Sequence, residues 1–312
     1  MTIKGFFKAL GKAAVWFAIY YVWQILVINW ASIGASFYVG VNADQYVDMS
    51  QLESDLEAGV IDEDSFTALY TELNDELYDV IYDIIMKYSV HLTLASGVLT
   101  LITYYVIFRM RKKNLLREAC VTKLPLRQVP VLLLLGAALN VFISTVMEII
   151  PFPQSWIDAY IESSSVLVES GAVITFITSV IAAPIVEEVV FRGLCYTRLK
   201  RGMPMLAAML ICAWGFGLMH GTAIWFLYAS VVGLLLAWVF EKYRSLTASI
   251  LVHFSFNLCG DLLSYITEVN DAAFWLMMAA GGLVSLALIA YIVKTSPNKI
   301  EIGLPEQQEE TT

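Results

Sequence analysis

The sequence predicts an all-α membrane protein, a polytopic bundle of about eight transmembrane helices. Its composition is the first reason, because 59% of the 312 residues are hydrophobic and only 15% are charged. Soluble domains are about 45–50% apolar and roughly 25% charged. The formal net charge of −9 also argues against a basic surface for nucleic-acid phosphates. We therefore expect membrane lipid around the bundle and no nucleic-acid partner.

Long apolar segments are the second reason. A helix needs about 20 mostly apolar residues to cross the hydrocarbon core of a membrane. The segment 204–220 is the weakest candidate, because it is short and begins at a Met-Pro pair. The candidate spans are 13–38, 86–108, 129–150, 171–191, 204–220, 222–240, 246–266 and 272–293.

The positions of Lys and Arg are the third reason, because these residues collect in cytoplasmic loops. Eight spans place the N-terminus and the segments after spans two, four, six and eight on one side. Those segments hold every one of the 19 basic residues except Lys87. We therefore expect an integral protein of a bacterial plasma membrane with both termini in the cytoplasm.

The loop between spans one and two is the largest segment predicted outside lipid. Residues 39–83 hold thirteen Asp or Glu residues and no Lys or Arg, so we place them outside the cytoplasm. One short helix should break at Gly59, and a second, capped by Asp64 or Ser65, should run toward span two. We interpret these acidic residues as a solvated surface that keeps the loop outside the cytoplasm. The alternative is that they bind cations or a basic peptide.

Charged residues inside predicted spans are costly, so each suggests a functional site. Span four ends with Glu187, Glu188 and Arg192. Glu188 and Arg192 are four residues apart and can pair on one helix face. Glu187 points about 100° away from that pair, and an unpaired carboxylate in an apolar site suits a general base. The alternative is a salt bridge at a helix end, with both glutamates in water.

The histidines favour the functional interpretation. His253 and Asn257 are four residues apart and share one face of span seven. His220 ends span five. His91, in span two, has no acidic neighbour at helical spacing, and we expect it to be a hydrogen-bonded histidine inside the bundle. The polar groups on spans four, five and seven are too many to explain as hydrogen bonds that only hold helices together.

These residues form three ordered motifs that resemble those of the CAAX protease and bacteriocin-processing family (CPBP or Abi), a group of intramembrane endopeptidases. The resemblance covers about residues 171–266 and implies hydrolysis of a peptide bond. The motifs are Glu187-Glu188-x-x-x-Arg192, Phe216-x-x-x-His220 and His253-x-x-x-Asn257.

The resemblance also implies a role for each motif residue, since amide hydrolysis needs an activated water and a stabilised oxyanion. The implied substrate is a peptide or a membrane-anchored protein. The implied roles are Glu187 as general base, His220 as a group that holds or polarises the water, His253 and Asn257 as oxyanion donors, and Glu188 as a carboxylate fixed by Arg192 that orients the site.

A metal centre is the alternative for the same residues. Glu188, His220 and His253 resemble a catalytic zinc set, but the helical HExxH motif is absent. A glutamate and histidine site also explains Asn257 better. We therefore favour a mechanism without metal and expect no cofactor, with zinc as the open alternative.

The expected organisation has three parts. Residues 1–128 hold spans one and two with the acidic loop, 129–293 form the protease core, and 294–312 form a disordered cytoplasmic tail. Two other functions stay open: a non-enzymatic bacteriocin-immunity or scaffold protein with the same fold, and a transporter. If the protein were a transporter, two similar halves of the chain would be expected, and no repeat is visible in the sequence.

The predicted spans leave one geometric conflict. Span seven enters from the cytoplasm near residue 246, so His253 should lie roughly 10 Å deep. Span five enters near residue 204, so His220 should lie roughly 24 Å deep. The two histidines meet only if span five tilts strongly or starts inside a cavity that opens to the cytoplasm.

Overall fold

The computed structural model describes residues 2–46, 48–266 and 269–296. Over these ranges the chain forms helices joined by turns and loops, with no strand. The predicted all-α integral membrane bundle is confirmed, and its seven described spans are close to the predicted eight. The helices long and apolar enough to cross a membrane are α1 (Ile3–Val41), α3 (Glu63–Met110), Leu126–Ile149 with α5 (Val129–Ile149), Ala172–Leu199, α11 (Ala223–Tyr243), α12 (Leu246–Leu263) and α13 (Asp271–Thr295).

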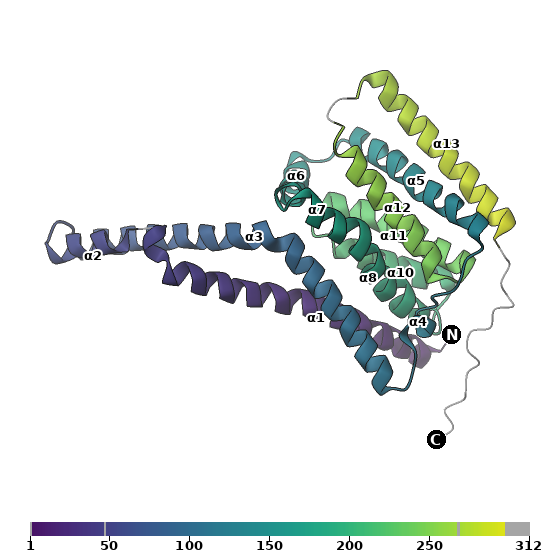
Figure 1. The fold of residues 1–312 in the computed structure, drawn as a ribbon, viewed down its shortest axis with the longest axis horizontal. Helices are drawn as coiled ribbons and strands as arrows, with labels where there is room; N and C mark the ends of the chain where they lie inside the picture. The colour runs from purple at the N-terminus through teal and green to yellow at the C-terminus, as the bar shows by residue number, and fades with distance from the viewer. Residues whose placement is uncertain (1, 47, 267–268, 297–312) are drawn as a thin grey trace.

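The helices α1 and α3 form a long hairpin that projects from the bundle (Figure 1). Both run well beyond the predicted spans 13–38 and 86–108. The short helix α2 (Met49–Glu57) joins them, and α3 continues from the acidic segment into span two as predicted. The acidic residues therefore lie mainly on helical surface.

The start of α3 differs by a few residues from the prediction. Its N-cap is Asp62, whose side chain accepts a hydrogen bond from the backbone N–H of Ser65 at 2.9 Å. The hydrogen bonds from Ser65 hold the pKa of Asp62 below its usual value. Asp64, one of the two predicted caps, lies inside the first turn.

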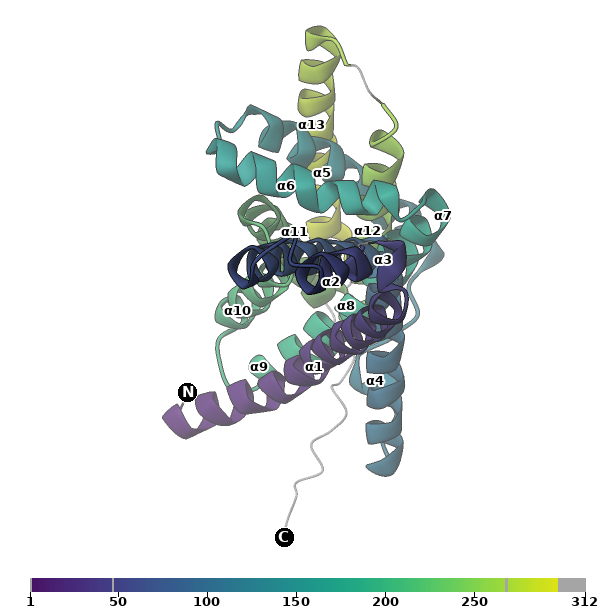
Figure 2. The ribbon, with the colours of Figure 1, turned by 90° about the vertical axis from the view of Figure 1, so that its left-hand side faces the viewer.

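The helix α5 packs between α12 and α13 (Figure 1). A Cβ at Gly136 would lie 2.2 Å from the backbone oxygen of Val252, which is shorter than any real contact. Glycine is therefore required there, and it brings the backbone of α12 directly against α5. In both views α13 and α1 lie far apart, with other helices between them (Figures 1 and 2).

The helix that carries the glutamates is longer than the predicted span 171–191. It continues through η4 (Val189–Tyr196) to Leu199, so Arg192 and Arg198 are buried within it. The prediction that span four ends at residue 191, with both arginines in the loop that follows, is therefore wrong. Both charges are compensated inside the protein, Arg198 by Glu118 at 2.9 Å. A further helix, α6 (Gln154–Glu169), occupies most of the segment between the predicted spans 129–150 and 171–191.

The fifth predicted span, 204–220, is the short helix α10 (Met205–Leu218), which has 14 residues. It pairs with α11, and a Cβ at Gly217 would lie 2.7 Å from the oxygen of Phe226. At about 1.5 Å per residue, α10 is too short to cross a membrane. The chain therefore turns back between α10 and α11 within the bundle.

Two other predictions concern residues at the edges of the bundle. His91 is exposed, and its ring meets that of Tyr88 edge-on at 5.6 Å between centroids. The prediction of a hydrogen-bonded histidine inside the bundle is wrong, because this face of α3 points outward. The predicted tail 294–312 begins inside α13, and residues 297–312 lie outside the described ranges.

The surface of the bundle is apolar where it would face lipid. On α13, Leu276, Leu283 and Leu286 are each at least 66% exposed. Their spacing places them on one helix face. Such a surface would be unfavourable in water and is typical of a helix in lipid.

Candidate active site

Glu187 and Glu188 lie at the end of a short α-helical segment, α8 (Ala183–Glu188). A π-helical segment precedes it (η3, Phe176–Ala182) and another follows it (η4). π-Helical turns are rare and occur frequently at functional sites. The glutamates are thus carried on a helix whose hydrogen bonds shift register on both sides of them.

Glu188 forms a fully buried ion pair with Arg192, as predicted. Arg192 Nη1 donates to Glu188 Oε1 at 2.6 Å, and both side chains are 0% exposed. Arg192 Nη2 also donates to the carbonyl oxygen of Gly233 at 2.9 Å. The guanidinium carbon lies 4.6 Å from the centroid of the Phe216 ring. Arg192 therefore balances the buried carboxylate and ties the glutamate helix to α10 and α11.

His253 lies between the two glutamates. Its Nδ1 is 3.1 Å from Glu188 Oε1, and its Nε2 is 3.7 Å from Glu187 Oε2. A carboxylate paired with arginine accepts hydrogen bonds, so Nδ1 carries a hydrogen and Nε2 faces Glu187. The ring of His253 therefore lies between the two carboxylates, hydrogen-bonded to Glu188 and facing Glu187 across a gap slightly longer than a hydrogen bond.

His220 is brought to the same place by Phe216. The ring of Phe216 lies 4.8 Å from that of His220 and 5.7 Å from that of His253. His220 Nδ1 is 2.8 Å from the backbone oxygen of Phe216. Because a carbonyl only accepts, Nδ1 donates and Nε2 is left as an acceptor in the neutral ring. The turn after α10 thus brings His220 and His253 to the two sides of one ring, although they come from different helices.

Asn257 is partly engaged elsewhere. Its Nδ2 donates to the backbone oxygen of Ser179 at 2.8 Å. That oxygen lacks a helical partner, because the N–H of Ala183 bonds to Thr178 and Pro184 has no N–H. Asn257 therefore replaces a hydrogen bond that the π-helical segment cannot make, and one of its two amide hydrogens remains for other partners.

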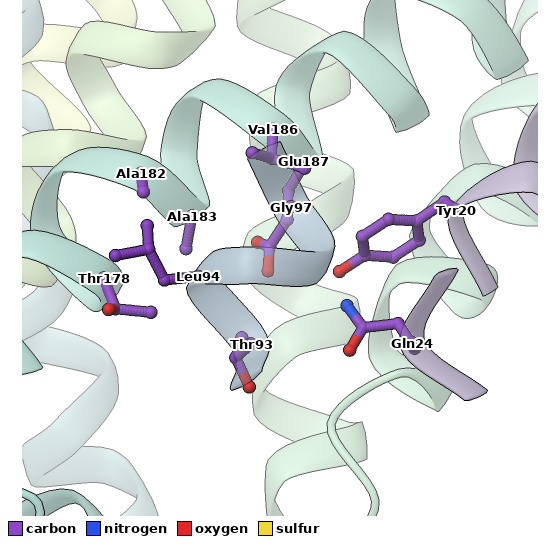
Figure 3. Close-up of a pocket in the computed structure, with 10 residues that line it drawn as sticks. All are labelled: Tyr20, Gln24, Thr93, Leu94, Gly97, Thr178, Ala182, Ala183, Val186 and Glu187. Carbon is purple, nitrogen blue, oxygen red and sulfur yellow. The ribbon is translucent and has the colours of Figure 1, made fainter. Parts of the chain in front are cut away.

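A small cavity beside Glu187 brings in residues that the motifs did not identify (Figure 3). Its volume is about 20 Å³. Tyr20 and Gln24 of α1 and Thr93 of α3 line it together with Glu187 and Thr178. The motifs did not point to α1, but Gln24 is a polar residue in an apolar span, which is a signal that could have identified it.

The residues proposed for zinc do not fit a metal ion. Among the described residues, no group of three His, Cys, Asp or Glu side chains is arranged to hold one. Glu188 faces the Arg192 guanidinium at 2.6 Å, and that positive charge would repel a cation. Glu188, His220 and His253 therefore suit a hydrogen-bonded site better than a zinc site.

Comparison with known families agrees with the motifs. Residues 169–259 match the family model described as type II CAAX prenyl endopeptidase Rce1-like. All the motif residues lie in this segment, so the resemblance is confirmed there, whereas α1, α3, α5 and α13 lie outside it. No curated protein and no solved structure matches the chain.

Proposed function

We propose that this chain is an intramembrane endopeptidase that hydrolyses a peptide bond of a membrane-associated or peptide substrate, with Glu187 as the general base. One observation carries the proposal: the Glu187 carboxylate faces His253 Nε2 at 3.7 Å, while the buried Glu188–Arg192 pair holds the other side of that ring. A carboxylate and an imidazole placed this close can accept and donate protons during a reaction. The matched family, which consists of proteases, supports the same assignment.

The reaction needs a water and two proton transfers. Glu187 removes a proton from a water whose oxygen attacks the carbonyl carbon of the substrate. His220 Nε2, an acceptor in the neutral ring, holds the second hydrogen of this water. The resulting tetrahedral oxyanion then collapses and the C–N bond breaks. The protonated Glu187 returns its proton to the departing amine, so the carboxylate is restored.

The oxyanion needs donors, and two residues are available. Asn257 keeps one amide hydrogen after its bond to Ser179. His253, held at Nδ1 by Glu188, can donate from Nε2 when that nitrogen carries a proton. Donors fixed before the reaction stabilise an oxyanion more than mobile water does.

The proposal includes a location and a mechanism without metal. The site would lie within a bacterial plasma membrane, with both termini of the chain in the cytoplasm, as the Lys and Arg pattern indicates. This topology requires α10 and α11 to enter and leave the membrane together on the cytoplasmic side, so that the other six spans cross it. No step requires a metal ion, so chelators should leave the activity unchanged.

Cleavage of peptides by the purified protein tests this function. The protein is reconstituted in liposomes with membrane-anchored peptides of varied sequence, and the fragments are identified by mass. We expect fragments that carry a new carboxyl group. They should also form after chelator treatment, and they should not form with the His220→Ala variant. No cleavage of any peptide would favour the immunity or scaffold protein instead. Proton flux across the liposomes without cleavage would favour the transporter.

A further inference from the structure

The first helix, α1, contributes polar groups to the cavity beside Glu187, although it lies outside the segment matched by the family model. The side chain of Tyr20 is buried, with an exposed fraction of 5%. Its ring meets that of Phe191 edge-on at 6.3 Å between centroids. Its hydroxyl points into the cavity toward the Glu187 carboxylate, and the Gln24 amide points there as well (Figure 3). A buried tyrosine hydroxyl usually finds a hydrogen-bond partner.

The cavity has the size and the walls for one water molecule. Its volume is about 20 Å³, and about 10–15 Å³ on this measure is enough for one water. On the wall opposite α1, Thr178 Oγ1 is buried without a hydrogen-bond partner. A buried water needs two to four polar partners, and Tyr20, Gln24, Thr178 and Glu187 supply them.

We propose that Tyr20 is a positioning residue for Glu187, acting with Gln24 through a single water held in this cavity. The water accepts from the Tyr20 hydroxyl and donates to the Glu187 carboxylate. No residue of α12 lines the cavity, so Glu187 is held here independently of its contact with His253. The carboxylate is thereby fixed in one orientation. This inference rests on the proposed role of Glu187 as general base.

The first test measures Glu187 without any substrate. Dicyclohexylcarbodiimide is an apolar reagent that modifies protonated carboxyl groups inside membranes, and the mass of the Glu187 peptide reports the modification. Labelling is followed from pH 5 to pH 9 in the wild type and in Tyr20→Phe. Loss of a donor disfavours the ionised carboxylate. The midpoint of labelling should therefore move to higher pH by about half a unit or more.

A matched control separates this effect from a change in packing. Tyr104 is also buried between α1 and α3, and its hydroxyl donates to the backbone oxygen of Trp16 at 2.5 Å. Tyr104→Phe removes a buried hydroxyl from the same interface that does not line the cavity, and should leave the labelling midpoint unchanged. If Tyr20→Phe also leaves the midpoint unchanged while it remains folded, the inference is wrong.

The second test measures catalysis. Tyr20→Phe should lower kcat by up to about tenfold, as expected when the water that holds the Glu187 carboxylate loses one hydrogen bond. KM should not change, because a positioning residue acts on Glu187 and not on the substrate. A wild-type kcat in Tyr20→Phe would overturn the inference and leave the proposed function intact. A shifted labelling midpoint in a protein that cleaves no peptide would overturn the proposed function and leave the link between Tyr20 and Glu187.

A second variant keeps the test decisive if Tyr20→Phe does not fold. Gln24→Met removes the other polar group of the α1 wall at similar side-chain length. It should move the labelling midpoint in the same direction. A folded Gln24→Met with the wild-type midpoint would then contradict the inference.

Discussion

Asn257 donates an amide hydrogen to the backbone oxygen of Ser179 at 2.8 Å, and this bond ties α12 to the π-helical segment before the glutamates. The bond exists because Pro184 offers no N–H to Ser179. Asn257 is therefore expected to have two roles, one in holding the helices and one in donating to the oxyanion.

Asn257→Ala should separate these two roles when combined with Pro184→Ala. The single variant leaves a partly buried carbonyl without a partner, which should lower the free energy of unfolding by about 1 kcal/mol. Pro184→Ala restores an N–H that can reach Ser179, so the double variant should regain stability in thermal unfolding. It should not regain kcat. Recovery of kcat in the double variant would show that Asn257 is not an oxyanion donor.

The local part of the site could be predicted from the sequence. The pairing of Glu188 with Arg192 follows from their spacing on one helix, and no tertiary contact is needed to infer it. The position of His220 could not be predicted in this way. It depends on how the end of α10 packs against α12, where the ring of Phe216 lies between His220 and His253, and spacing along one helix does not show this contact.

Tertiary contacts explain the remaining differences. Nothing local in the sequence shows that the carbonyl of Ser179 finds its partner on α12, so the π-helical segment was not predicted. The same holds for Tyr20, since only the packing of α1 brings it to Glu187. Arg198 looked like a loop residue because its partner, Glu118, is distant in the sequence.

Arg192→Met should be strongly destabilising. It leaves Glu188 as an unpaired buried charge, and breaking such a pair typically costs about 3–5 kcal/mol. Arg192→Lys should not restore stability, because one ammonium cannot reach both Glu188 and the Gly233 carbonyl as the guanidinium does. The control is Lys113→Ala, which removes a partly exposed ion pair with Glu118. Its free energy of unfolding should fall by less than about 1 kcal/mol. Equal stability of the two variants would argue against the buried pair.

Gly136→Ala should displace α12 and with it His253. The added Cβ would meet the Val252 oxygen, and overpacking of this kind costs about 1–3 kcal/mol. Activity should fall further than stability alone explains, because Val252 precedes His253. Gly11→Ala is the control, since a Cβ there meets nothing within 4 Å, and it should stabilise α1 by up to about 1 kcal/mol. A fully active Gly136→Ala would mean that α12 can move without disturbing the site.

The acidic segment 39–83, which joins α1 to α3, should lie outside the cytoplasm and take no part in catalysis. A cysteine introduced at Ser54 should react with an impermeant thiol reagent in intact cells, after the natural cysteines have been replaced. Deletion of residues 45–62 should leave peptide cleavage measurable. Reaction only after lysis would reverse the proposed topology. A folded deletion variant without activity would instead indicate that the hairpin admits the substrate.

The central claim is that Glu187 is the general base, and kcat of Glu187→Gln tests it most directly. Glutamine keeps the size of the side chain and its contacts but cannot accept a proton. General-base catalysis contributes about 10²–10⁴-fold, so kcat should fall at least a hundredfold while the thermal unfolding transition stays near that of the wild type. A folded Glu187→Gln protein that cleaves peptides at the wild-type rate would contradict the account.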